Sequence, residues 1–390
     1  MTHAWTLGVE EEYFLVDCET LDATPANELV LQQCSLDGVD AAAEMQACTV
    51  EIGTPVCASA REVEQALLKA RRDLDGRASQ FGCRLAAVPT HPFAGLEQTI
   101  TNGARYQWVS DQYGWVAHRT MTCGMHVHVG IPSMERGVPL LNDLRAYAPL
   151  LLALSANSPF VDGVDTGLAS VRNRVAGLYP RAGIPPAVSS WPAYQAQQRA
   201  LGMAGFVSSS KDLWWAVRLH PTWQTVELRV CDVQLAAAHA AAIAALMQAL
   251  CRMIDHEEGG RTIGRFAEVP DVMFEENLWS AARHGVSGTM IDIDTLTPAC
   301  DGAEAVPTKV ALERLLARLE PWLLDAGNAE ALEVARELIG ANGACRQRAF
   351  HQRSGSLVDL MRRVVEATVE DTSGVAAELP ASAEVAAASS

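Results

Sequence analysis

Short segments in which apolar and polar side chains alternate recur through the first 235 residues, and Gly and Pro separate them. Residues i and i+2 of a β-strand point to the same face, so this alternation is typical of strands with one buried and one solvated face. We expect strands at residues 7–16, 49–54, 84–89, 121–131 and 225–231.

Helical periodicity interrupts these strands and dominates after residue 235. Ser59 and Glu62 have the spacing of a capping box, and apolar residues from Val63 to Phe81 then recur on one helical face. The segment 156–190 is rich in Gly, Pro, Arg and Ser, which favours long ordered loops. Further helices are expected at residues 138–155, 236–256, 307–324, 328–340 and 354–370.

The order of these elements favours an α+β fold. Strands and helices do not alternate strictly, so we expect an antiparallel β-sheet with one polar, metal-binding face and helices packed on the other. Residues 1–370 should form a single domain, sheet-rich over 1–235 and helical over 236–370. Residues 371–390 contain small residues and no aromatic residue, so we expect a disordered tail.

The polar positions of four predicted strands hold mainly Glu and His, with no Lys. Those that share the polar face are Glu10 and Glu12, Glu51, His126 and His128, and Glu227 and Arg229. Any one strand of this kind is usually an ordinary solvated face. Four carboxylates on one face, however, repel one another strongly unless cations lie between them. Carboxylates with one or two imidazoles suit Mg²⁺ or Mn²⁺, so the face is predicted to bind such ions.

Glu11 does not fit this pattern, because the alternation places it on the helix-covered face. Edge exposure or a local β-bulge are the explanations that the sequence offers.

The composition of the chain limits which binding partners and which cellular location are expected. Lys and Arg number 30 and Asp and Glu 47, giving a net charge of −17, which makes nucleic acid or an anionic membrane a poor partner. No apolar run approaches the ~18 residues of a membrane helix, and the first residues lack the basic segment of a secretory signal. The ten cysteines form no C-x-x-C motif. We therefore expect reduced thiols and a cytoplasmic protein.

Several nucleotide-binding and hydrolase motifs are missing. The chain has no G-x-x-x-x-G-K-[ST] loop, no G-x-G-x-x-G after a strand, no G-x-S-x-G and no H-E-x-x-H. If phosphate is bound, metal ions and arginines must hold it.

At this point the motifs resemble those of a known family, the carboxylate–amine ligases related to type 2 glutamate–cysteine ligase. The resemblance extends over roughly residues 5–365. It rests on G-V-E-E-E at 8–12, V-E-I-G-T-P at 50–55, T-H-P-F at 90–93, C-G-M-H-V-H-V-G at 123–130, A-L-S-A-N-S-P-F at 153–160, R-L-H-P at 218–221 and T-V-E-L-R-V at 225–230. It implies a glutamine-synthetase-like sheet with Mg-ATP on its polar face, and ATP-dependent amide formation between a small carboxylate and an amine.

The resemblance also implies roles for individual residues. The transferred phosphoryl group would be contacted by Arg229 and by the metal that Glu51 holds. Weaker candidates for contact with a carboxylate or phosphate are Arg172, Arg174 and Arg218. Glu44 could join the metal shell, and Ala216 stands where relatives often carry an acid. The implied metal ligands are Glu10, Glu12, Glu51, His126, His128 and Glu227, with the choice between the two histidines open.

The implied reaction passes through an acyl phosphate, because a carboxylate is a poor electrophile until its oxygen is phosphorylated. The default product is of the γ-glutamyl-cysteine type, but the sequence does not identify the two substrates. The apolar segments 138–155 and 236–250 could pack internally or form the face of a homodimer.

Two interpretations from other classes stay open. One is a metal-dependent hydrolase that uses His126 and His128, although His220 and His239 lack partners at convincing spacing. The other is a cupin-like binding module, for which Glu135 stands too far beyond His128. Neither accounts for the four glutamates.

Overall fold

The computed structural model describes residues 4–32, 34, 36, 38–95, 99–257 and 262–370. The tail expected at 371–390 lies outside the described residues. All strand pairings in the main sheet are antiparallel, in the order β2-β3-β1-β5-β9-β8, with β4 paired to β1 beyond the end of β3. The strands are β1 Leu7–Asp17, β2 Asp40–Ala43, β3 Thr49–Gly53, β4 Cys83–Ala86, β5 Gly124–Gly130, β8 Val217–His220 and β9 Thr225–Asp232.

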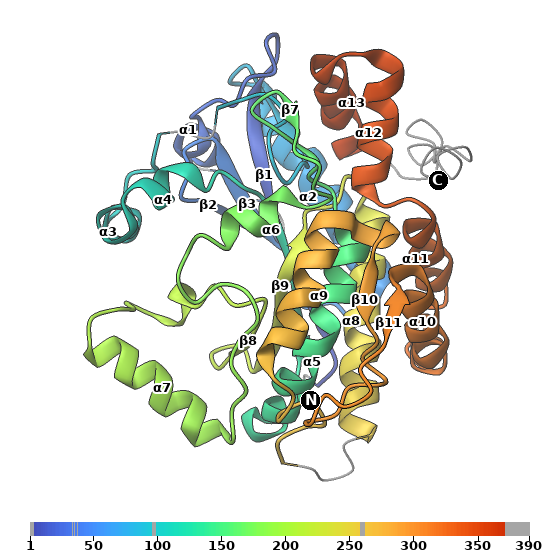
Figure 1. Ribbon diagram of the computed structural model, residues 1–390. Coiled ribbons are helices and arrows are strands. Elements are labelled where there is room, and N and C mark those ends of the chain that lie inside the picture. The colour runs from blue at the N-terminus through green and yellow to red at the C-terminus, as the bar shows by residue number, and fades with distance from the viewer. Residues whose placement is uncertain are drawn as a thin grey trace.

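Helices cover one face of this sheet, so the predicted α+β class is confirmed. The helices are α1 Asn27–Leu31, α2 Ala60–Ser79, α3 Ala104–Tyr113, α4 Trp115–Arg119, α5 Met134–Ser155, α6 Val171–Ala176, α7 Trp191–Met203, α8 Ala237–Glu257, α9 Asp271–His284, α10 Thr308–Asp325, α11 Glu330–Gly340, α12 Gly343–Ser354 and α13 Leu357–Val369. Helix α2 packs on β1 and β4, α8 on β5, and α5 on β8 and β9, while α10 and α11 lie outside α8 (Figure 1).

The expected elements are present with small shifts at their ends, and several others were not foreseen. Ser59 caps α2 as expected, because its hydroxyl accepts a hydrogen bond from the Glu62 amide. Two short sheets, β6 Phe160–Val161 with β7 Val164–Asp165 and β10 Thr289–Ile291 with β11 Ala305–Pro307, were missed, as were β2, β8, α1, α3, α4, α6, α7, α9 and α12. These elements are short or weakly amphipathic, so periodicity alone does not reveal them.

Helix α8 is long and apolar enough to meet the length and hydropathy criteria for a membrane span, but 89% of its most apolar stretch is buried inside the protein. It packs against α2, α5, α10 and α11, so its composition is that of a core helix.

Glu11 is explained by a buried ion pair, and the explanations by edge exposure or a bulge were wrong. Its side chain is fully buried and pairs with Arg71 of α2 at 2.8 Å. Arg71 also donates to the carbonyl oxygens of Gln234 and Leu235, just after β9, at 2.8 and 2.7 Å. The Tyr13 hydroxyl donates to the same carboxylate. A charge on the apolar face is therefore neutralised by a charge from the covering helix.

Candidate active site

The register of the sheet gathers the predicted polar residues into adjoining pairs. Glu12 on β1 stands opposite Glu51 on β3, and Glu10 stands opposite His126 on β5. One step along the sheet, His128 on β5 stands opposite Glu227 on β9, which in turn stands opposite Arg218 on β8. Antiparallel neighbours bring such side chains within about 5 Å of each other.

The two histidines contact carboxylates on both sides. His126 Nδ1 lies 3.0 Å from Glu10 Oε2, and its Nε2 lies 3.9 Å from Glu12 Oε1. Burial, reinforced by the charge of Arg229, lowers the pKa of His126. The ring is therefore neutral at pH 7, which is the form that binds metal ions.

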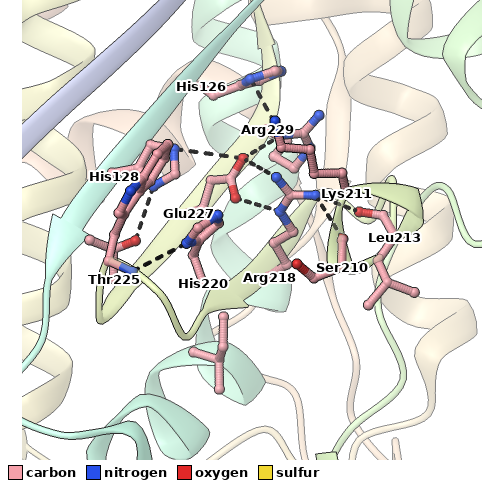
Figure 2. Close-up of polar contacts among 12 residues, drawn as sticks. His126, His128, Ser210, Lys211, Leu213, Arg218, His220, Thr225, Glu227 and Arg229 are labelled. Atoms are coloured by element: carbon pink, nitrogen blue, oxygen red, sulfur yellow. Dashed lines mark hydrogen bonds and ion pairs between the residues drawn. The ribbon is translucent and has the colours of Figure 1, made fainter. Parts of the chain in front are cut away.

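Glu227 is fully buried between two arginines (Figure 2). Arg218 and Arg229 both donate to its carboxylate, and His128 Nε2 lies 3.7 Å away on the other side. Burial alone would raise the pKa of Glu227, but the positive charges of its neighbours, first that of Arg229 and also that of Arg218, outweigh burial and hold that pKa well below the ordinary value. The carboxylate is thus a permanent anion.

Glu12, Glu44 and Glu51 form an acidic cluster in which each residue offers one oxygen within 4.8 Å of the others. Burial, followed by the charge of Glu12, raises the pKa of Glu44 to about 7. Burial and the charges of Glu44, Glu10 and Glu12 likewise raise the pKa of Glu51. Without a cation, the cluster resists ionisation. The sequence placed Glu44 here only as a secondary candidate.

The residues present fit divalent cations. Two further sets bring ligand atoms within 4.8 Å of one another: Glu10, Glu51 and His126, and Glu10, His128 and Glu227. His128 Nε2 is buried and has no hydrogen-bond partner among the described residues, although it lies 3.6 Å from Glu10 Oε1 and 3.7 Å from Glu227 Oε1. These gaps are too long for hydrogen bonds and leave the nitrogen free to bind a metal ion. Its Nδ1 contacts Thr225 Oγ1 at 3.0 Å, which orients the ring.

This polar face forms the floor of a cavity of about 280 Å³. Its other lining residues come from helix α3, from residues 120 and 122 just after α4, and from the segments 172–183 and 211–223. The predicted residues in its wall are Glu10, Glu12, Glu51, His126, Arg172, Arg218 and Arg229, joined by Glu44 and Ala216.

Arg172 and Arg174, both on helix α6 in the segment expected to form loops, make different contacts. Arg172 lies in the cavity wall and donates to the carbonyl oxygens of Val230 and Arg229 at 3.2 and 3.4 Å. A Cβ at Gly124 would come within 2.0 Å of its guanidinium, so any larger residue there would displace the Arg172 side chain. Arg174 is not in the cavity wall; its guanidinium lies over the ring of Trp279, 5.5 Å from the centroid.

Comparison with known proteins identifies the family. The model of glutamate–cysteine ligase family 2 matches residues 6–367. The chain belongs to this family. It is 38% identical over 368 residues to "Putative glutamate--cysteine ligase 2-3" of Rubrobacter xylanophilus, an alignment that covers 93% of this chain and 97% of the relative. It is 33% identical to "Putative glutamate--cysteine ligase 2" of Paracoccus denitrificans, over 92% of this chain and 98% of the relative.

Solved structures support the fold. The glutamate–cysteine ligase of Francisella tularensis, crystallised with AMP, superposes with a TM-score of 0.66 at 13% identity, over 96% of this chain and 91% of that one. The bifunctional glutathione synthetase of Pasteurella multocida gives 0.61 at 15% identity, over 94% of this chain but only 53% of the other. The predicted class of enzyme, a ligase of the glutamate–cysteine ligase type, is thus confirmed at the level of the family.

The structure also reveals cavity residues that the motifs did not indicate. They come from helix α3, from the end of β8 and from the segments between the named elements: Met45, Arg105, Tyr106, Tyr179, Lys211, Trp214, His220 and Trp223. The sequence offered no metal-binding partner for His220 at a convincing spacing. In the structure its ring stacks on that of Trp223 with centroids 4.2 Å apart, and its centroid lies 5.8 Å from that of the His128 ring. The R-L-H-P motif was the one sequence signal that pointed to it.

Proposed function

We propose that this protein is an ATP-dependent carboxylate–amine ligase that forms an amide of the γ-glutamyl type through an acyl phosphate. The observation that carries the proposal is the acidic face with an orphaned imidazole nitrogen, His128 Nε2, in a chain of the glutamate–cysteine ligase family. The nucleotide of the Francisella relative is AMP, and ATP is the co-substrate that we propose here.

The residues that would hold Mg²⁺ or Mn²⁺ are the carboxylates and imidazoles of the strands at the centre of the sheet. When bound, such ions neutralise the triphosphate and align it with the substrate carboxylate. An acidic protein can bind ATP in this way because the bound cations reverse the negative charge at the site. The proposed ligands are Glu10, Glu12, Glu51, His126, His128 and Glu227.

Arg229 has the position expected of a group that stabilises the transferred phosphoryl. It lies in the cavity wall, is held by Glu227, and its Nη1 is 3.4 Å from His126 Nδ1. A guanidinium fixed in this way has donors ready for developing phosphoryl charge, without reorganisation. Arg218 uses its Nε and both Nη atoms for protein acceptors, and Arg172 gives one hydrogen bond from each Nη to a backbone carbonyl, so we propose that both contribute to nucleotide binding mainly by their charge.

The ten cysteines are free thiols, and the reaction as proposed needs none of them as a nucleophile. Reduced thiols and a need for ATP support a cytoplasmic location, which we propose with the activity.

Hydroxylamine provides the test, since it is a small nucleophile that can replace the amine. Incubation with Mg-ATP, glutamate and hydroxylamine should give the γ-glutamyl hydroxamate with ADP and phosphate, and other carboxylates should follow if glutamate fails. AMP with pyrophosphate would contradict phosphoryl transfer, because it indicates an acyl adenylate. Hydroxamate formed without ATP would favour the hydrolase interpretation.

A further inference from the structure

One end of the cavity carries a panel of aromatic rings. The rings of Tyr179 and Trp214 are stacked with centroids 4.5 Å apart, and both residues line the cavity. Tyr113 stands edge-on to each of them at 5.3 Å. We call these three residues the aromatic panel. Such packed aromatic groups offer a large, flat apolar surface to a ligand.

The panel is held rigidly by polar contacts at its edges. The hydroxyls of Tyr179 and Thr120 are 2.8 Å apart, and Arg181 donates to the Tyr113 hydroxyl at 2.7 Å. The Arg181 guanidinium also lies 5.7 Å from the centroid of the Trp214 ring. Rings that are ordered before binding lose little further entropy when a ligand packs on them.

The panel adjoins the acidic cluster of Glu12, Glu44 and Glu51. Glu44 lies between two residues that contact aromatic side chains: Met45 Sδ is 3.7 Å from the Tyr179 hydroxyl, and the Ala43 carbonyl accepts a hydrogen bond from Tyr106. Glu44 is not among the proposed metal ligands, and a carboxylate next to aromatic rings attracts an ammonium group.

Two cations lie near the same end. Lys211 is exposed beside the cavity, and none of the described residues pairs with its ammonium group. Arg105 is part-exposed and gives one nitrogen to Asp212 at 2.9 Å. An amino acid bound here therefore meets the Glu44 carboxylate for its ammonium group, cations for its carboxylate and flat rings for its side chain.

We propose that this end of the cavity binds the amine substrate, and that the amine is an amino acid with an aromatic or large apolar side chain in preference to cysteine. The inference rests on the proposed ligase function and specifies its second substrate. A thiol of cysteine's size leaves most of the panel uncovered, whereas a phenyl or indole ring packs on it.

The opposite end has a different character. There Trp223 is 55% exposed and stacks on His220, next to the strands that carry His128 and Glu227. Glu227 is neutralised by Arg218 and Arg229, so this carboxylate is not available to attract an ammonium group. A substitution at Trp214 should therefore change the preference for aromatic amines, whereas one at Trp223 should not.

The test measures kcat/KM of the wild-type enzyme for phenylalanine, tryptophan, leucine, cysteine and glycine, with Mg-ATP and the carboxylate that gives hydroxamate. We expect the aromatic amino acids to exceed cysteine about tenfold, the size of one good ring contact. Isothermal titration of phenylalanine into enzyme with Mg²⁺ and a non-hydrolysable ATP analogue should show the same preference without turnover.

Substitutions of single tryptophans test whether the aromatic panel is the binding site of the amine. Trp214→Leu should abolish the preference, Trp214→Phe should keep most of it because it retains a ring, and Trp223→Leu should leave it unchanged. Trp115→Leu is the matched control, because Trp115 is 64% exposed and does not line the cavity. Cysteine as the best amine, or loss of the preference in the Trp223 variant alone, would overturn the inference. Hydroxamate formation without any preference for aromatic amines also overturns it, whereas the absence of hydroxamate with every carboxylate refutes the proposed function itself.

Discussion

Replacing Arg71 with Met tests whether the buried pair with Glu11 holds the sheet to its covering helix. The substitution removes a guanidinium that is fully buried and that bonds Glu11 and the carbonyl oxygens of Gln234 and Leu235. Met fills much of the same volume, so the loss in the free energy of unfolding comes mainly from the missing polar contacts and not from a cavity.

The expected cost follows from the partners left behind. Glu11 would remain as a buried carboxylate with only the Tyr13 hydroxyl as a donor among these groups, and removal of one partner of a buried pair costs about 3–5 kcal/mol. Two carbonyl oxygens would also lose a donor, at about 1 kcal/mol each. Since these costs overlap, we expect a loss of about 4 kcal/mol in the free energy of unfolding.

Urea unfolding at pH 7 measures this loss, with Glu11→Leu and the double variant as controls. The double variant leaves no unpaired charge, so it should be clearly more stable than the Arg71→Met variant. A loss below about 1 kcal/mol for Arg71→Met would refute the reasoning, and so would a double variant that shows the sum of the two single losses.

Three further predictions concern the acidic face and the end of the chain. Glu10→Gln or Glu12→Gln should lower Mg-ATP turnover more than about 100-fold with an unchanged circular dichroism spectrum, since a proposed metal ligand is lost; wild-type rates would rule out the ligand assignment. In EDTA, the raised pKa values of Glu44, about 7, and Glu51 mean that the folded protein holds more protons than the unfolded chain above the ordinary pKa of 4.5. The free energy of unfolding should therefore fall, by about 2 kcal/mol for the part-exposed Glu44, as pH rises from about 5 to 8, and Glu51→Gln should reduce the fall; urea midpoints that do not change with pH would contradict this. Truncation after Glu370 should change neither melting temperature nor activity, because residues 371–390 have little apolar surface to bury; a drop in either would show that the tail docks.

The polar face is the part of the site that is predictable from the sequence. The two-residue period of a strand fixes which side chains share a face, so the sequence alone pairs Glu10 with Glu12 and His126 with His128. Their identity as Glu and His, which ordinary solvated faces seldom concentrate, indicates cations. The motifs then indicate the family, which the comparisons confirm.

What a strand pattern cannot give is the order and register of the strands. That Glu12 meets Glu51, and that His128 meets Glu227, depends on β5 lying between β1 and β9, which is a long-range choice made by packing. Glu11 shows the same limit, because its partner Arg71 lies 60 residues away on a helix.

The surroundings proposed for the second substrate were decided by tertiary structure alone. Tyr113, Tyr179 and Trp214 come from three segments without clear periodicity, and only the folding of these segments over the sheet brings their rings together. Local sequence determines which face of a strand is polar, since that follows from backbone geometry within a few residues. The contacts that we propose to select the second substrate join α3 to two distant loops, and they depend on the packing of the whole chain.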